Sequence, residues 1–181
     1  GLGDVYKRQG VSTESGIPDF RSKGSAEAAQ KRFGYPPEVL LSHDFFLAHP
    51  DIFYDYYKSV LLVPASPNPA HYALARLEAA GKLNAVITQN IDNLHERAGS
   101  SHVIHLHGEL LKACSIRDLN TTYDISPENP DLHIGDKDPH GVQLRPFIVW
   151  FGEAVPMIDP AIRLVEDCDI FVVIGTSLNV Y

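Results

Sequence analysis

Short apolar runs that end on polar or glycine-rich turns constrain the fold of this chain more than any other feature. Residues 83–88, 103–107 and 169–174 have the length and composition of buried strands. Helical patterns alternate with these runs, most clearly after Asn68 and over residues 161–166. Strands that alternate with helices predict an α/β fold with a doubly wound parallel sheet.

The helix after Asn68 carries signals at both ends. Asn68 suits the N-cap position, Pro69 suits the first turn, and Gly81 is expected to end the helix. A brief helix is expected after the polar turn at residues 89–92. Residues 25–63 are expected to form two or three further helices, because they carry helical segments rich in Phe and Tyr.

The composition changes between residues 111 and 144, where Asp, Pro, Gly and Asn replace the apolar periodicity. This change predicts a small inserted lobe. We therefore expect one domain over residues 10–181, with its small lobe at about 111–144. Residues 1–9 have no convincing period, and we interpret them as a non-native start.

Charge and composition exclude several classes of protein. The net charge of −8 disfavours a nucleic-acid partner and suits basic peptides. No apolar run approaches the roughly 20 residues that span a bilayer, so no membrane role is expected. Cys114 and Cys168 stand far apart, which favours a reducing, cytoplasmic location over a disulfide framework. Nothing in the sequence indicates the oligomeric state.

Three polar motifs carry candidate chemistry. Residues 10–21 (GVSTESGIPDFR) combine small residues that admit a ligand with a charged and aromatic pair. Residues 88–95 (TQNIDNLH) place amides and a carboxylate directly after a strand, where doubly wound folds bind ligands. His107, in the segment HLHG, adds a group that titrates near neutrality. Taken singly, these motifs also fit a surface loop, a capped helix start and a structural histidine.

Several motifs in order resemble the sirtuin (Sir2-type) family: GVSTESGIPDFRS, TQNIDNLHERAG, HLHG, LRPFIVWFGE and GTSLNV. The match runs from Gly10 to the last residue. The resemblance implies a Rossmann-like NAD-binding domain with a small lobe, and an acyl-lysine protein or peptide bound between them. It also implies an NAD-dependent protein-lysine deacylase that transfers the acyl group to ADP-ribose and releases nicotinamide.

The resemblance also implies roles for single residues. His107 is the expected general base, and Asn90 and Asp92 are the expected catalytic partners in the nicotinamide and ribose pocket. The cofactor-binding residues it implies are Gly10, Asp19, Phe20, Arg21, Gln89, Asn90, Asp92, Gly175, Thr176 and Ser177. The segment from Val149 through Phe151 to Gly152 is expected to pair with the substrate backbone.

The small lobe departs from the family at its metal site. Relatives usually carry two Cys-x-x-Cys pairs, whereas only Cys114 stands near the expected place and Arg117 occupies its partner position. We expect no structural zinc and a bacterial-looking, zinc-lacking form. Local packing of apolar side chains is then expected to hold the lobe, namely Leu119, Tyr123, Ile125, Leu132 and Ile134.

The acyl pocket supplies a second departure. Relatives that prefer succinyl or malonyl groups carry Tyr-x-x-Arg, whereas Tyr54 is followed here by Tyr57 in the Arg position. Without that Arg an acidic acyl group has no bidentate partner, which favours acetyl. Lys58 keeps the acidic alternative open, and Tyr54 also fits plain helix packing.

Both ends of the chain also depart from the family. Arg8 and Gln9 stand where relatives carry an apolar strand, and the chain stops soon after its Gly-Thr-Ser turn. We interpret the sequence as truncated at both ends. Two alternatives to a deacylase therefore stay open: an NAD hydrolase or ADP-ribosyltransferase, and a non-catalytic fragment that binds NAD or peptide.

Overall fold

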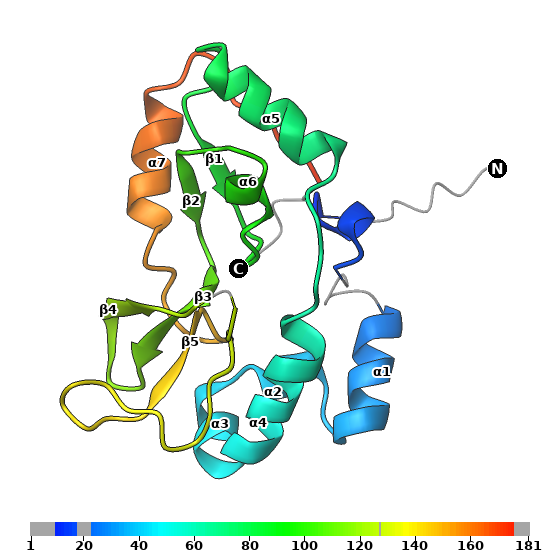
Figure 1. Cartoon of the computed structure of the whole chain (residues 1–181), viewed down its shortest axis with the longest axis vertical. Helices are drawn as coiled ribbons and strands as arrows, with labels where there is room; N and C mark the ends of the chain where they lie inside the picture. The colour runs from blue at the N-terminus through cyan, green and yellow to red at the C-terminus, as the bar shows by residue number, and fades with distance from the viewer. Residues whose placement is uncertain (1–9, 18–22, 127, 176–181) are drawn as a thin grey trace.

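A computed structural model describes residues 10–17, 23–126 and 128–175 of the chain. One part is built around a parallel sheet and the other around an antiparallel sheet, with helices beside each (Figure 1). The elements in chain order are η1 (Thr13–Ser15), α1 (Lys23–Phe33), α2 (Pro37–Leu40), α3 (His43–Ala48), α4 (Pro50–Tyr56), the π-helical turn η2 (Tyr57–Leu61), α5 (Pro69–Ala79), β1 (Val86–Thr88), α6 (Leu94–Arg97), β2 (Val103–His105), β3 (Gly108–Ser115), β4 (Asp118–Asp124), β5 (Leu144–Ile148) and α7 (Ile158–Glu166).

The parallel sheet consists of β1 and β2, which confirms two of the predicted strands in shortened form. Thr88 pairs in register with His105, so both strands end at the same edge. The Leu106 amide continues the ladder by donating to the Thr88 carbonyl oxygen at 2.9 Å. The turns that follow β1 and β2 are therefore held side by side.

Helix α5 begins and ends as its sequence predicts. The Asn68 side chain accepts hydrogen bonds from the amides of Ala70 and His71, and the His71 ring accepts one from the Asn68 amide. This reciprocal arrangement is a capping box in which histidine replaces the usual Glu or Gln. Gly81 follows the helix with φ of 65°, a conformation that favours glycine.

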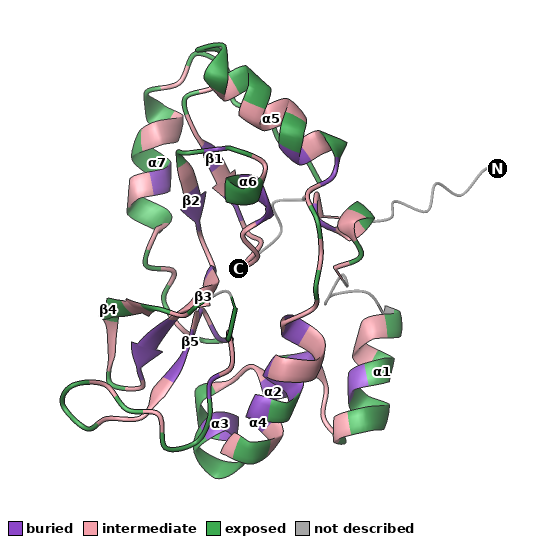
Figure 2. Ribbon diagram, in the orientation of Figure 1, coloured by how far each residue is buried: buried purple, intermediate pink, exposed green. Residues whose placement is uncertain are grey.

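The antiparallel sheet has β3 between β4 and β5, and it shares one core with the helices that precede α5. Phe46 and Phe53 contact the Trp150 ring, each with ring centroids 5.2 Å apart. Buried residues accordingly gather on α3, α4 and the sheet in Figure 2. The lobe predicted over residues 111–144 is thus packed together with α1–α4 in one larger unit.

The prediction of a strand over residues 169–174 is wrong for the described structure. These residues form no strand, and the side chains of residues 170–174 are exposed, with Ile170 reaching 79%. A strand needs a partner edge as well as an apolar pattern. No described strand pairs with this segment, so its hydrophobicity alone does not order it as part of a sheet.

The apolar residues expected to hold the small lobe are mostly, but not all, in place. Leu132 is buried in the core, and Tyr123 and Ile125 pack against it. Ile134 is 59% exposed, so the expectation that it packs in the lobe is wrong. It lies in a tight turn whose polar neighbours make the contacts: the His133 amide donates to the Asp136 carboxylate. Across the described ranges, no helix has the length and apolar character needed to cross a membrane.

Candidate active site

The polar turn after β1 and the histidine after β2 meet at the carboxyl edge of the parallel sheet. The Asn90 amide donates to the Thr88 hydroxyl at 3.0 Å, and the Leu94 amide donates to the Asp92 carboxylate at 3.1 Å. The turn is therefore shaped by its own side chains. The N-cap position of α6 is Asn93, so Asp92 bonds to the first turn from the residue before the cap and neither Asn90 nor Asp92 is the predicted cap.

The ring of His107 is oriented by the backbone of that turn. Its Nδ1 lies 3.0 Å from the carbonyl oxygen of Gln89. A carbonyl only accepts hydrogen bonds, so Nδ1 carries the proton and donates it. In neutral His107 the lone pair then belongs to Nε2, which is the arrangement a general base requires.

A second contact joins the turn to the N-terminal segment. The Asn90 side-chain amide donates to the Ser12 hydroxyl at 2.8 Å, and a Cβ added at Gly10 would lie 3.5 Å from Asn90 Oδ1. The backbone of the N-terminal motif therefore approaches Asn90 closely. Small residues, an amide and a carboxylate converge here, and this donor set fits the ribose and carboxamide groups of a nucleotide cofactor.

The buried His71 ring also contacts the Ser12 hydroxyl. Its Nδ1 accepts the Asn68 amide at 3.2 Å, so Nε2 carries the proton and points at Ser12 Oγ, 3.4 Å away. The His71 side chain is fully buried, and burial lowers its pKa. The imidazole is consequently held neutral and in one tautomer.

His105 lies beneath the turn as half of an ion pair. Its Nδ1 is 2.8 Å from the Asn90 carbonyl oxygen, and its Nε2 is 2.8 Å from the Glu96 carboxylate. Because both partners are acceptors, both ring nitrogens carry protons when Glu96 is ionised. Burial lowers the pKa of His105, but the hydrogen bonds to Glu96 and Asn90 raise it by more than burial lowers it. The net change in the pKa is upward.

This ion pair predicts a pH dependence of stability. The raised pKa of His105 means that its contribution is complete below the ordinary value of 6.5 and is lost as the pH rises through the folded-state pKa. Burial raises the pKa of Glu96, but the His105 hydrogen bond lowers it on balance, so that contribution is lost as the pH falls below the ordinary value of 4.5. The pair therefore stabilises the fold most between these two values.

We expect His105→Gln to reduce the free energy of unfolding more at about pH 5.5 than at about pH 9. Urea denaturation at both pH values measures the difference. His102→Gln is the matched control, because His102 is exposed and its Nδ1 also lies near a backbone carbonyl oxygen, that of Asn84. A reduction for His105→Gln that is equal at both pH values would contradict a charged pair.

Gly108 allows the turn after β2 to lie against β5. Its φ is 82°, and a Cβ at this position would overlap the carbonyl oxygen of Phe147. A hydrogen bond next to Gly108 also joins the two segments: the Val149 amide donates to the His107 carbonyl oxygen at 2.8 Å. The main chain that follows the expected general base is thus fixed to the antiparallel sheet, whereas Leu106 before it is bonded to the parallel sheet.

The expected substrate segment follows β5. The Phe151 amide donates to the Leu41 carbonyl oxygen at 3.0 Å, and the Trp150 amide donates to the Glu153 carboxylate at 2.8 Å. Phe151 and Gly152 are exposed, whereas Trp150 is buried. The segment is therefore held by its own amides and presents two residues to solvent.

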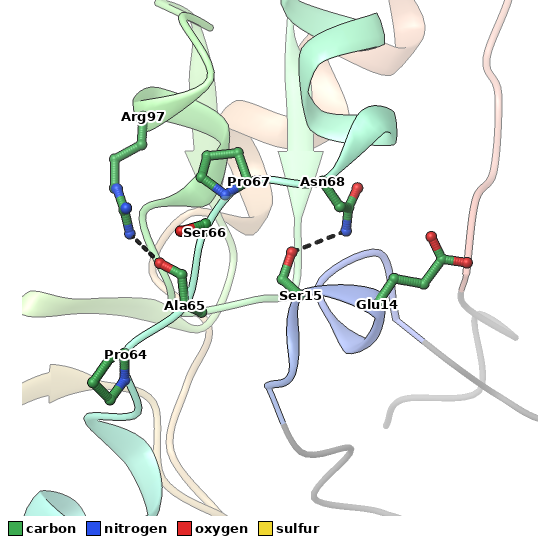
Figure 3. A pocket seen from close by; sticks show the side chains of 8 residues that line it. All are labelled: Glu14, Ser15, Pro64, Ala65, Ser66, Pro67, Asn68 and Arg97. Carbon is green, nitrogen blue, oxygen red and sulfur yellow. Dashed lines mark hydrogen bonds between the residues drawn. The ribbon is translucent and has the colours of Figure 1, made fainter.

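An open pocket of about 640 Å³ is bordered by η1, by the linker that precedes α5, and by Arg97 of α6 (Figure 3). Asn68 donates to the Ser15 hydroxyl at 3.1 Å on one wall, and Arg97 donates to the Ala65 carbonyl oxygen at 2.6 Å on another. The lining residues are Glu14, Ser15, Pro64, Ala65, Ser66, Pro67, Asn68 and Arg97. Neither His107 nor the 89–92 turn lines this pocket, so we do not assign it to the reacting groups.

Tyr54 and Tyr57 are buried, and their hydroxyls bond to backbone. The Tyr54 hydroxyl donates to the Leu144 carbonyl oxygen at 2.6 Å, and burial raises its pKa to about 12. The Tyr57 hydroxyl lies 3.1 Å from the Leu110 carbonyl oxygen. These contacts support the packing interpretation of the tyrosines and give no support to Tyr54 as a substrate contact.

The residues around Cys114 do not fit a structural zinc ion. Its thiol is fully buried, and burial raises its pKa to about 11, whereas zinc binds the thiolate. The Arg145 guanidinium lies close enough to lower that pKa in part. Over the described ranges, no three His, Cys, Asp or Glu side chains form a group that could hold a metal.

The structure brings together only part of the predicted site. Gln89, Asn90, Asp92 and His107 meet at the sheet edge, Gly10 lies against Asn90, and Gly175 is described but exposed. Five predicted residues lie outside the described ranges: Asp19, Phe20, Arg21, Thr176 and Ser177.

Sequence reasoning missed several residues that organise the site: Ser12, His71, Glu96, Arg145 and Glu153. One of them had a usable signal. His71 stands three residues after the N-cap Asn68, where a capping box places a side chain that bonds back to the cap. The others make contacts that no local sequence pattern indicates.

Comparison with known proteins is consistent with this geometry. An NAD-dependent protein deacylase of Bacteroides thetaiotaomicron is 50% identical over 182 residues, which cover 98% of this chain and 75% of that protein. An NAD-dependent protein deacetylase of Clostridium tetani is 46% identical over 176 residues, which cover 95% of this chain and 71% of that protein. A solved complex of a Sir2 homologue with NAD is 42% identical with a TM-score of 0.70, and the match covers 86% of this chain and 60% of that one.

The chain thus spans less than two thirds of that solved relative. The likeness of fold confirms the predicted Rossmann-like α/β class. The sequence profile of the Sir2 family matches residues 9–181, which is nearly the whole sequence. The chain belongs to the Sir2 family.

Proposed function

We propose that this chain is an NAD-dependent protein-lysine deacylase that removes acetyl groups. The observation that carries the proposal is the His107 ring, whose Nδ1 bonds to the Gln89 carbonyl oxygen and leaves Nε2 as the basic atom. The names of the relatives support the same activity. When bound, NAD supplies the ADP-ribosyl group that receives the acyl group as nicotinamide leaves.

The residues of this chain would divide the work as follows. Gln89, Asn90 and Asp92 would hold the nicotinamide and ribose end of the cofactor, because their turn lies at the sheet edge beside Gly10. His107 Nε2 would take a proton from a ribose hydroxyl. General-base assistance of this kind contributes a factor of about 10²–10⁴ in rate.

The acyl-lysine peptide would lie along Val149–Gly152 as an added strand. We further propose that residues 10–181 act as one catalytic domain, because the Val149 amide ties the antiparallel lobe to His107. A cytoplasmic location is also proposed, since Cys114 and Cys168 are both free thiols, as reducing compartments favour.

The test is to incubate the purified chain with NAD and an acetyl-lysine peptide and to analyse the products by mass spectrometry. Deacetylated peptide together with O-acetyl-ADP-ribose supports the proposal. Nicotinamide release without deacetylation indicates NAD hydrolysis or ADP-ribosyl transfer instead. Binding without any product indicates a non-catalytic fragment.

We predict that an acetyl-lysine peptide is processed at least about tenfold faster than its succinyl counterpart, because Tyr57 stands where an arginine fork would bind the acid. The alternative cation in the sequence, Lys58, is already engaged, because its Nζ lies 2.8 Å from the Asp131 carboxylate. Initial rates with the two peptides measure the ratio. Equal rates with the two peptides would contradict the prediction. If Lys58→Gln then slowed only the succinyl peptide, Lys58 would be shown to leave Asp131 and bind the acid.

A further inference from the structure

A buried ion pair closes the chain segment that follows β5. Arg145 Nη1 lies 2.6 Å from Glu153 Oε1, and Arg145 Nη2 lies 2.8 Å from Glu153 Oε2. The Arg145 side chain is only 1% exposed. Burial raises the pKa of Glu153, but the hydrogen bonds from Arg145 lower it on balance, so the carboxylate stays ionised.

The same two side chains hold the backbone between them. Arg145 Nη2 donates to the Ile148 carbonyl oxygen at 2.7 Å, and its guanidinium stacks on the Trp150 ring at 3.4 Å. Glu153 Oε2 accepts the Trp150 amide at 2.8 Å. Both ends of the segment and its central indole are therefore fixed by one bidentate pair.

Stability alone is a weak reason for such a pair. Removing two charges from water costs about as much as their attraction returns, and a well-packed apolar pair is often as stable. What the pair supplies is geometry, because a planar fork on a carboxylate fixes distance and orientation together. The backbone whose position the pair fixes is the segment that contains Val149, Phe151 and Gly152.

The held segment reaches two other parts of the molecule. The Val149 amide donates to the His107 carbonyl oxygen, and the Phe151 amide donates to the Leu41 carbonyl oxygen in the helical region. With the Trp150 amide on Glu153, three successive amides donate within the protein. A peptide that pairs here must donate its own amides to the carbonyl oxygens of this segment, or use the Gly152 amide.

We propose that Arg145 and Glu153 are positioning residues for the acyl-lysine peptide. They hold the segment Val149–Gly152 as a preformed edge, so that peptide binding does not have to order it. Neither residue touches the reacting atoms, and both act through the backbone of the segment. This inference rests on the proposed deacylase function.

The test compares Glu153→Gln with Asp55→Asn in the full chain. Glu153→Gln keeps the shape of the side chain and removes its charge. Asp55→Asn is the matched control, because Asp55 also pairs with an arginine, Arg32, but at the surface and 4.0 Å away. We measure KM for the acetyl-lysine peptide, KM for NAD, and hydrogen exchange of the Trp150 amide.

Glu153→Gln is expected to raise the peptide KM about tenfold or more while the NAD KM stays within roughly twofold. Exchange of the Trp150 amide should become faster, and Asp55→Asn should change none of these quantities. Arg145→Lys should share the rise in peptide KM, because an ammonium keeps the charge but not the fork. Glu153→Asp, which keeps the charge, replaces Glu153→Gln if circular dichroism shows that the latter is unfolded.

Two results would overturn the proposal. One is an unchanged peptide KM in a folded variant. The other is a parallel change of kcat and both KM values with a lower Tm, which would indicate a structural role only. Failure of the parent function looks different: the unaltered chain would neither bind nor deacetylate the peptide, and faster exchange at Trp150 would then report only a backbone clamp.

Discussion

Replacement of His107 by alanine is expected to lower kcat/KM for deacetylation by about 10²–10⁴, the usual contribution of a positioned general base. The geometric reason is the hydrogen bond from Nδ1 to the Gln89 carbonyl oxygen, which places the ring proton on Nδ1 and the basic lone pair on Nε2. Initial rates with an acetyl-lysine peptide measure the loss. NAD binding, measured by calorimetry, should change far less than the rate.

The matched control for this prediction is His102→Ala. His102 also lies near a backbone carbonyl oxygen through Nδ1, at 2.7 Å from Asn84, but it is exposed at the opposite end of β2. Its replacement should leave the rate unchanged. A His107→Ala variant that keeps a rate close to that of the unaltered chain would remove His107 from the mechanism.

Replacement of Gly108 by alanine is expected to reduce the free energy of unfolding by about 2–5 kcal/mol. About 1–2 kcal/mol comes from placing a side chain at φ of 82°. A further 1–3 kcal/mol, roughly, comes from the overlap with the Phe147 carbonyl oxygen, which forces β5 away. Urea denaturation measures the sum.

Gly141→Ala separates the two contributions. Gly141 has a similar φ of 81°, but a Cβ there would meet nothing within 4 Å. Its replacement should therefore show the conformational strain alone. If both variants lose the same free energy, the close approach of the Gly108 turn to β5 is not tight in solution. If Gly108→Ala loses more, deacetylation should fall as well, since His107 shares that turn.

Local signals in the sequence predicted the elements whose contacts are local. The helix after Asn68 is an example, because its cap, its first-turn proline and its terminal glycine lie within a few residues of the backbone groups they serve. The strands β1 and β2 were also predicted, although each is shorter than its apolar run. The segment 169–174 shows the limit of such signals, because an apolar pattern does not supply a pairing partner.

The site residues, like the elements of the fold, were predicted from the sequence where the signal is local and missed where the contact joins distant residues. His107 and the 89–92 turn were predicted because each stands at the end of an apolar strand, and parallel strands bring their ends together. The Asn90–Ser12 contact joins residues 78 apart in sequence, and no local pattern indicates it. The sequence analysis made no prediction for Arg145, whose burial depends on its carboxylate partner Glu153 and on the Trp150 ring.

The position of Trp150 has a practical consequence. It is the only tryptophan in the chain, so light absorbed at the red edge of the protein spectrum excites one indole in one known place. That indole lies under a guanidinium and beside the exposed Phe151, and its emission should respond to changes in either contact. The protein thus carries an intrinsic fluorophore at the proposed peptide edge, with which peptide titrations can be followed without a label.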